Sequence, residues 1–391
     1  MQVVRKVQVA NPCPVPVEQA ASSLRLAVIL SLIAGLLSCV PGHPAKSEGV
    51  AGNYCWAPGK LRAKRGEAKV RITRRAYRSV PAGGIIRATA QFESTGKVLR
   101  RVELPPGRKL VAFTFDLCEQ PFEIAGYQGD IIDYLREHKV PVTFFAGGKW
   151  LLTHPERAAQ LLGDPLFETG NHAWEHRFFP LLTRSRMNTE IEAAQLAYQQ
   201  VHKCLRDRRC LGPNGKPAFQ NALSQQQLFR FPFGACTPEA IKAVGSHGLL
   251  AVQWDVSSSD AWRGQSLSGM VSSVLKRVRS GSIVLFHANG RGWKTAEALP
   301  ILVKELHKRG YEFVQVSELI AAGRPVYAEK CYDFREGDVN RYRPIAARLE
   351  RSYDRFYKRL GKRPPQIAPI AGERAGNTGS FSHKNDGEVP N

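Results

Sequence analysis

Acidic residues are scarce in this sequence, and recognised nucleic-acid-binding motifs are absent from it. The 391 residues contain 34 Asp and Glu against 56 Lys and Arg, which gives a formal net charge of +22. More than half of the excess lies in residues 56–109, where 15 Lys and Arg accompany 3 Glu. A basic surface attracts polyanions in general. Because no DNA- or RNA-binding motif is present, we expect no nucleic-acid partner. We expect this segment to bind an anionic lipid or an acidic polymer.

Long hydrophobic runs are also missing. The twelve residues from Leu26 to Leu37 carry no charge, whereas a membrane-spanning helix needs about 20 apolar residues. The run follows the basic residues Arg5, Lys6 and Arg25, and this order is typical of a secretory signal. The residues that end at Cys39 resemble a bacterial lipoprotein box, which would place a lipid on that cysteine. We expect export to the periplasm or cell envelope, with or without this anchor.

Closely spaced cysteine pairs are absent as well. No Cys-x-x-Cys motif occurs, which argues against a structural zinc ribbon. Six cysteines follow Cys39, and an exported protein can keep them as disulfides. The spacing allows Cys204 and Cys210 to close a small loop, although sequence alone does not fix the connectivity. We also hypothesise that Cys118 and Cys236 approach one another, because each lies beside a motif described below.

The pattern of elements predicts an α/β fold. After a basic stretch, apolar runs such as Leu110–Asp116, Leu249–Val256 and Ser282–His287 alternate with helical segments, one of which opens on a Thr153/Glu156 capping box. Strands that alternate with helices favour parallel pairing and a (β/α) barrel. We divide the chain into an export segment (1–44), a basic extension (45–107), the α/β domain (108–319), and a basic helix with a disordered tail (320–391).

Polar residues of the kinds that do chemistry fall at or just beyond the carboxyl ends of the predicted strands. In a (β/α) barrel these ends converge on one face, where active sites are built. The residues are Asp116, His172, His176, Arg230, Asp260 and His287.

Five short motifs contain these residues, and in order and spacing they resemble those of the polysaccharide deacetylase family, also called the NodB homology domain or carbohydrate esterase family 4. The likeness covers about 210 residues, and five motifs in sequence are far more specific than any one. The motifs are Thr114-Phe-Asp116, His172-Ala-Trp-Glu-His176, Arg230-Phe-Pro-Phe-Gly234, Asp260-Ala-Trp262 and Leu285-Phe-His287. The resemblance implies a distorted (β/α) barrel and a metal-dependent hydrolase that removes N-acetyl or O-acetyl groups from an envelope or extracellular polysaccharide.

The resemblance also implies roles at the metal and the base. His172 and His176 would bind a divalent metal, for which the residue types favour Zn²⁺. Asp116 would be the general base, and Arg230 would orient it through a charge-assisted hydrogen bond.

The remaining roles concern the substrate and the leaving group. His287 would be the general acid, and Asp260 would set its tautomer, with Asp255 as the competing partner. The backbone N–H of Phe233 would stabilise the oxyanion, and Leu285 would line the acetyl pocket.

Departures from the family pattern leave alternatives open. The family usually has a second aspartate after its base, where this chain has Leu117, which cannot bind a metal. Glu119, Asp116 itself or water would then complete the site. Ala173 replaces a hydroxyl residue, and Trp262 is displaced by one position. Two other functions therefore remain: a catalytically silent glycan-binding domain, and a hydrolase of a small cyclic amide.

Overall fold

The computed structural model describes residues 55–84, 91–92, 95–208 and 226–367. The apolar run at Leu26–Leu37, the candidate anchor Cys39, and Cys210 lie outside these residues, so those expectations stay predictions. No helix within the described ranges is long and apolar enough to cross a bilayer.

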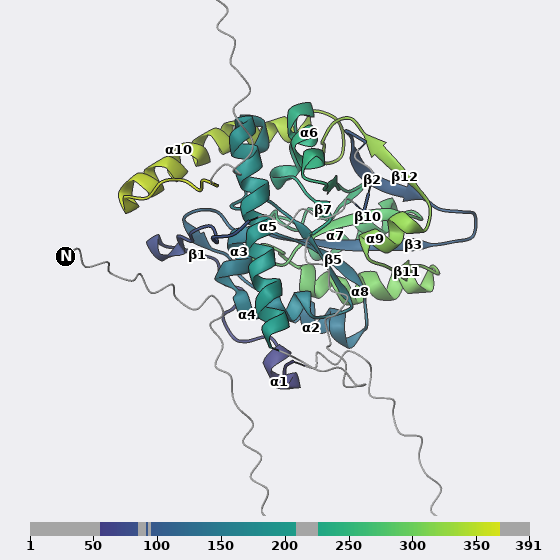
Figure 1. The fold of residues 1–391 in the computed structure, drawn as a ribbon. Coiled ribbons are helices and arrows are strands. Elements are labelled where there is room, and N and C mark those ends of the chain that lie inside the picture. The colour runs from purple at the N-terminus through teal and green to yellow at the C-terminus, as the bar shows by residue number, and fades with distance from the viewer. Residues whose placement is uncertain (1–54, 85–90, 93–94, 209–225, 368–391) are drawn as a thin grey trace, which may run out of the picture.

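A distorted (β/α) barrel forms the centre of the molecule, as expected from the sequence (Figure 1). Strands β3, β5, β6, β7 and β8 pair in parallel in that order, and β10 pairs in parallel with the other side of β3. β2 pairs antiparallel with β10, and a parallel bridge between Leu99 and Val252 joins β2 to the end of β8 and closes the ring. The strands of the ring are β2 (Val98–Glu103), β3 (Leu110–Leu117), β5 (Val142–Ala146), β6 (Phe167–Asn171), β7 (Leu228–Phe229), β8 (Leu250–Ala251) and β10 (Ser282–His287).

Three further strands extend this sheet. β9 (Val256–Ser257) pairs with β10, β11 (Glu312–Phe313) with β3, and β12 (Arg324–Ala328) with β2. β2 comes from the segment assigned to the basic extension, and β12 lies beyond the expected end of the α/β domain. The sheet therefore continues past both expected boundaries.

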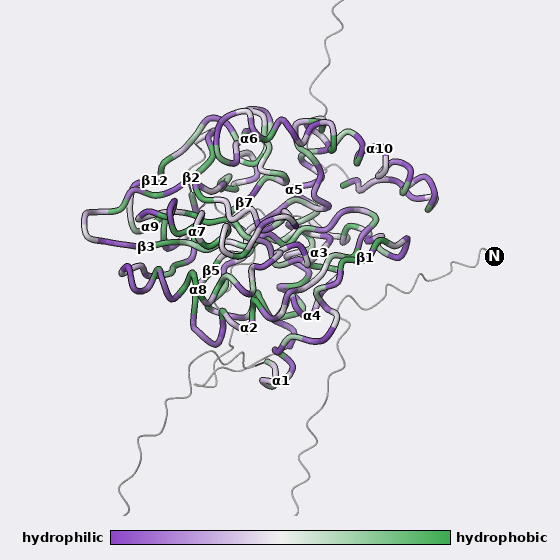
Figure 2. The backbone as a smooth tube through the Cα atoms, turned by 180° about the vertical axis from the view of Figure 1, so that it is seen from behind, coloured by the Kyte–Doolittle hydropathy of each residue, from purple (hydrophilic) through white to green (hydrophobic). Residues whose placement is uncertain are grey.

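Most of the helices surround the ring and bury an apolar face against the strands or against one another. All eight residues of β3 are buried, which is typical of a parallel strand covered on both sides. Figure 2 shows hydrophobic and hydrophilic residues alternating along outer helices such as α8. The helices are α1 (Pro58–Leu61), α2 (Gly129–Glu137), α3 (Gly148–Thr153), α4 (Pro155–Leu162), α5 (Arg184–Asp207), α6 (Pro238–Ser246), α7 (Leu267–Arg277), α8 (Thr295–Lys308), α9 (Val316–Ala321) and α10 (Arg343–Leu360).

Two local expectations are wrong. The run Leu249–Val256 is not one strand, because its first part pairs with β7 as β8 and its end pairs with β10 as β9. The capping box is absent, since α3 ends at Thr153 and α4 begins at Pro155. The Thr153 hydroxyl instead donates a hydrogen bond to Glu119.

The ordered part of the basic extension packs against the barrel. β1 (Arg71–Ile72) pairs with β4 (Glu123–Ile124) in a separate two-stranded sheet. The nearly buried guanidinium of Arg157 donates to backbone carbonyls of residues 60–62 and to both carboxylate oxygens of Glu67. A bidentate, partly buried ion pair of this kind fixes the segment in place.

A disulfide joins Cys236, beside the Arg230 motif, to Cys331 in the C-terminal segment. The hypothesis that Cys118 approaches Cys236 is therefore wrong, and Cys118 is a buried free thiol. Cys204 is disulfide-bonded, but its expected partner lies outside the described residues.

Replacing Cys236 and Cys331 together by alanine is expected to lower the free energy of unfolding by about 2–4 kcal/mol, because the crosslink spans 95 residues and restricts the unfolded chain. Denaturant unfolding under non-reducing conditions measures this change. Each single variant should lose about as much as the double one. An unchanged midpoint in the double variant, or peptide mapping that finds no crosslink between these cysteines, would contradict the assignment.

Candidate active site

Asp116 is held by a fully buried arginine. Arg230, just after β7, donates from Nη1 to Asp116 Oδ1 at 2.9 Å and to Thr114 Oγ1 at 2.8 Å. Its guanidinium lies 4.0 Å from the ring centroid of Phe145 and donates to the carbonyl of Gln253 at 3.1 Å. Arg230 therefore has a single geometry in which its charge favours the ionised carboxylate and leaves Asp116 Oδ2 available.

His287 lies beside Asp116 because the two residues are register partners in the parallel pair of β3 and β10. Asp260 Oδ1 accepts from His287 Nδ1 at 2.8 Å, and Asp260 Oδ2 accepts from the backbone N–H of His287 at 2.7 Å. A carboxylate can only accept, so Nδ1 carries a proton. Burial disfavours the imidazolium, but the Asp260 carboxylate outweighs it and raises the pKa of His287 above its usual value.

Asp255, the competing partner considered for His287, is engaged elsewhere. Its carboxylate accepts from the backbone N–H of Ile283 at 2.9 Å and from the Ser282 hydroxyl at 3.0 Å. Asp255 thus stabilises the start of β10, whereas Asp260 contacts the imidazole at its end.

His172 and His176 point toward one another, with ring centroids 5.1 Å apart. His172 Nδ1 lies 2.9 Å from the carbonyl of Arg230, so Nδ1 donates and Nε2 keeps its lone pair. His172 Nε2 and His176 Nδ1 are buried without a hydrogen-bond partner, and burial lowers the pKa of both imidazoles. Their ligand atoms and Cys118 Sγ all lie within 4.8 Å of one another, which makes these three residues the candidate metal ligands.

Glu119, expected as a substitute ligand, faces away from this group. Its carboxylate is fully buried and accepts from Lys149 Nζ at 3.0 Å, from the Thr153 hydroxyl at 2.8 Å and from the backbone N–H of Ala125 at 3.0 Å. Cys118, the preceding residue, lines the cavity instead. The expectation for Glu119 is corrected, since both of its oxygens stabilise the buried ammonium and the loop after β3.

Left-handed backbone is concentrated at the motifs. Six described residues other than glycine have φ between 52° and 65°, and four of them belong to or adjoin the predicted motifs. These four are Ala173, His176, Phe233 and Ser259. Each such residue costs about 1–3 kcal/mol and persists only where the surroundings impose it. The strained turns at His176 and Phe233 aim both residues at one cavity, where their rings lie 4.5 Å apart.

Buried acids and the C-terminal helix support the histidine loop. Glu190 of α5 accepts from the backbone N–H groups of Trp174 and Glu175, and burial and Glu175 raise the pKa of Glu190 to about 8. Arg177 pairs with Glu175 and with Glu350 of α10. α10, expected only as a basic amphipathic helix, therefore packs against the loop that carries His172 and His176.

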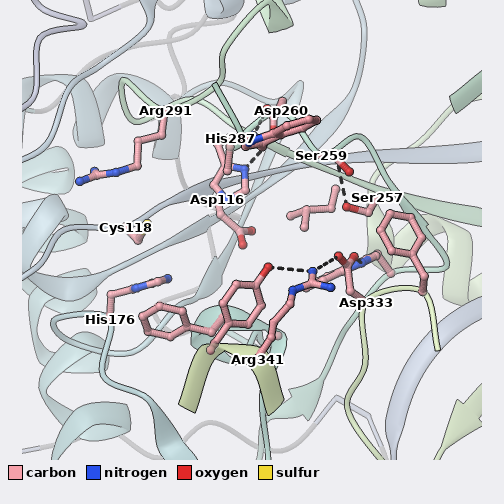
Figure 3. A pocket seen from close by; sticks show the side chains of 18 of the residues that line it. Asp116, Cys118, His176, Ser257, Ser259, Asp260, His287, Arg291, Asp333 and Arg341 are labelled. Atoms are coloured by element: carbon pink, nitrogen blue, oxygen red, sulfur yellow. Dashed lines mark hydrogen bonds and ion pairs between the residues drawn. The ribbon is translucent and has the colours of Figure 1, made fainter. Parts of the chain in front are cut away.

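Several of the side chains described above line a cavity of about 580 Å³ (Figure 3). Asp116 and His287 lie at its centre, with Cys118 and His176 on one side and Asp333 and Arg341 on the other. The expected site residues that line it are Asp116, His176, Phe233, Asp260, Leu285 and His287.

Part of the cavity wall comes from a C-terminal segment that the sequence did not identify as functional. Trp254 Nε1 donates to Asp333 Oδ1 at 3.0 Å, and Asp338 accepts from three backbone N–H groups of residues 333–335. Phe334 and Trp262 are 44% and 65% exposed, so the rim presents aromatic surface to solvent. Cys331 is the one signal of this wall in the sequence, because its disulfide partner Cys236 follows the Arg230 motif.

Comparisons with known proteins identify the family that this chain resembles. The profile of the polysaccharide deacetylase family matches residues 103–223. A peptidoglycan-N-acetylglucosamine deacetylase from Bacillus cereus is 29% identical over 232 residues, which are 59% of this chain and 96% of that protein. A chitooligosaccharide deacetylase from Bradyrhizobium is 30% identical over 226 residues, covering 54% and 91%. A family 4 carbohydrate esterase from Bacillus subtilis superposes with a TM-score of 0.46 at 21% identity, over 58% of this chain and 86% of that one.

Asp260→Asn is expected to lower the pKa of His287, because the variant removes the anion that stabilises the imidazolium. NMR titration of the imidazole in the metal-free protein measures this pKa directly. Asp255→Asn is the matched control, since its carboxylate contacts Ile283 and Ser282, and it should leave the titration where it is. Equal shifts in the two variants would show that Asp260 has no special role.

Proposed function

The chain belongs to the polysaccharide deacetylase family, and from that premise we propose that it hydrolyses N-acetyl or O-acetyl groups on a cell-envelope or extracellular polysaccharide. The observation that carries the proposal is the pairing of Asp116 with His287 across neighbouring strands, where both side chains line one cavity. The two relatives described above are named for N-acetylglucosamine in peptidoglycan and for chitooligosaccharide. A polymer that contains N-acetylglucosamine is accordingly the first substrate class to test.

The residues present fit the divalent metal that this family uses. Two buried imidazole nitrogens without hydrogen-bond partners lie near the thiol of Cys118, and nitrogen and sulfur are the donors that Zn²⁺ takes in proteins. When bound by Cys118, His172 and His176, the ion would polarise the acetyl carbonyl and favour ionisation of water.

Asp116 is positioned to accept the first proton. Arg230 occupies Oδ1, so Oδ2 takes the proton of the attacking water as the water oxygen bonds to the acetyl carbon. The guanidinium also fixes the orientation of the carboxylate before the substrate arrives.

His287 is positioned to supply the second proton. With Nδ1 directed to Asp260, Nε2 is the nitrogen left for the cavity. As the carbon–nitrogen bond breaks, Nε2 donates its proton to the leaving amine, and acetate and a free amino sugar result. Because the acid must be protonated, activity should fall as pH rises through the pKa of His287, which Asp260 holds above its usual value.

The acyl group would sit between Phe233 and Leu285. Phe233 adopts φ 59° in a one-turn 3₁₀ helix, Pro232–Gly234, beside the cavity, and its backbone N–H is our candidate donor to the oxyanion. Donors of this kind lower the barrier by about 3–4 kcal/mol. Leu285, 7% exposed, offers an apolar contact to the acetyl methyl group.

The aromatic rim would bind the sugars that flank the acetyl group. Trp262 contributes from the loop before α7, and Phe334 and Tyr342 from the C-terminal segment. Aromatic rings offer broad apolar faces to the carbon–hydrogen faces of pyranose rings. Export to the envelope would bring the chain to such polymers, and the anionic lipid or acidic polymer expected for the basic extension stays a prediction.

Purified protein supplied with Zn²⁺ is expected to release acetate from an N-acetylglucosamine oligomer or from peptidoglycan. Asp116→Asn and His287→Ala should each reduce kcat at least about 100-fold, the scale of a lost general base or acid. His247→Ala is the matched histidine control, because His247 bonds Glu192 outside the cavity, and it should retain full rate. Absence of acetate from a panel of acetylated glycans would contradict the proposal and favour a silent glycan-binding domain.

Phe334→Ala is expected to raise KM for long oligomers by about 2- to 13-fold, the equivalent of about 0.5–1.5 kcal/mol for an aromatic contact, with little change for a disaccharide. Steady-state kinetics on oligomers of increasing length separates these effects. Ile345→Ala removes a similarly exposed apolar side chain from α10 outside the cavity and should leave both KM values unchanged. Equal KM changes for short and long substrates would argue against a role in binding flanking sugars.

A further inference from the structure

We propose that Cys118 supplies a thiolate ligand, so that Cys118, His172 and His176 form a sulfur–nitrogen site that selects thiophilic divalent ions such as Zn²⁺ and Co²⁺ over Mg²⁺ and Mn²⁺. The inference deepens the proposed function and rests on it for the use of the ion. Its basis is the geometry at the end of β3.

The thiol of Cys118 lies close to both histidines. Cys118 Sγ lies within 4.8 Å of a ligand nitrogen on both histidines. Ligand atoms around a tetrahedral zinc ion are about 3.3–3.6 Å apart, given Zn–N near 2.1 Å and Zn–S near 2.3 Å. The three atoms already converge on a common point from separate loops, after β3 and after β6.

The histidines themselves indicate a ligand. His172 is 1% exposed, its Nδ1 is fixed on the Arg230 carbonyl, and its Nε2 has no hydrogen-bond partner. Metal-binding histidines characteristically donate their other N–H to a carbonyl or carboxylate in this way. His176 Nδ1 is likewise buried and without a partner. Two buried ring nitrogens without partners in one group are costly, and a cation bound between them would satisfy both.

The neighbouring residues leave the thiol as the donor from this strand end. Leu117 packs in the hydrophobic core, and the oxygens of Glu119 bind Lys149, Thr153 and Ala125. Asp116 Oδ1 bonds Arg230, while Oδ2 lies 3.5 Å from His172 Nε2 and is assigned to the base.

Asn289 fixes the position of the thiol. Its Nδ2 donates to the carbonyl of Cys118 at 2.8 Å and lies 3.0 Å from Sγ. An amide N–H directed at sulfur orients the side chain, as outer hydrogen bonds do at metal sites. Cys118 also takes no part in the disulfides of the described region, where Cys236 pairs with Cys331.

The chemical softness of these donors determines which metal ion the site prefers. Mg²⁺ and Mn²⁺ prefer carboxylate, carbonyl and water oxygens, whereas thiolate with imidazole suits zinc and other thiophilic ions. One sulfur and two nitrogens therefore disfavour the hard ions.

Absorption spectroscopy of the Co²⁺-loaded full chain tests this assignment. Thiolate–Co²⁺ bonding gives an intense near-ultraviolet charge-transfer band, which we expect in the wild type and in Asp116→Asn, and expect to be lost in Cys118→Ser and Cys118→Asp. Competition should show Zn²⁺ displacing Co²⁺, with at least about 100-fold weaker displacement by Mn²⁺ or Mg²⁺. Cys118→Asp keeps an anionic donor but replaces sulfur by oxygen. In this variant the preference for Zn²⁺ over Mn²⁺ or Mg²⁺ should fall at least about tenfold.

Bound Co²⁺ without the band in the wild type, a band that survives in Cys118→Ser, or equal displacement by Mn²⁺ would overturn the proposal. The wild-type spectrum decides the first point even if the serine variant fails to fold. If the protein removes acetyl groups but its Co²⁺ form lacks the charge-transfer band, the proposed function holds and Cys118 is not a metal ligand. If the Co²⁺ form shows the band but the protein releases acetate from no glycan, Cys118 is a metal ligand and the proposed function is wrong.

Discussion

The parallel register between β3 and β10 is the constraint on which the rest of the site depends. It sets Asp116 directly across from His287 at the carboxyl ends of two buried strands. A shift of β10 by one residue would turn His287 to the opposite face of the sheet from Asp116. The register is specified by continuous burial, since every residue of β3 and all but the last of β10 are buried. Catalytic geometry and core packing are therefore the same feature of the molecule.

Around this pair, buried polar groups hold one another in fixed positions. Arg230 is fully buried, and its hydrogen bonds reach Asp116, Thr114 and two backbone carbonyls. Removing one partner of such a pair leaves an uncompensated buried charge, which costs about 3–5 kcal/mol. The same logic applies at Glu190, whose carboxylate holds the loop between the two histidines. Rigidity here serves positioning, because misplacement by about 1 Å can lower a rate about 100-fold.

Much of this site follows from sequence because the strands are strongly patterned. Asp116, Arg230 and His287 end or follow apolar runs, and parallel pairing brings such ends together. Side-chain direction beyond a strand end has no comparable rule. Nothing near Glu119 in the chain shows that Lys149 of α3 holds it inside the protein, so the sequence does not identify Cys118 as the residue that reaches the cavity. Likewise, β8 and β9 read as one strand because both are apolar, although they pair with different neighbours. The wall at Phe334 depends on the link from Cys331 to Cys236, which spans 95 residues.

The central claim is that one water molecule, activated beside Asp116, cleaves an acetyl group from an amino sugar. Mass spectrometry of both products after reaction in oxygen-18 water tests it most directly. The account predicts acetate that carries one solvent oxygen, together with an unlabelled glycan that has lost its acetyl group. Label in the sugar chain, or a glycan that remains fully acetylated, would contradict it.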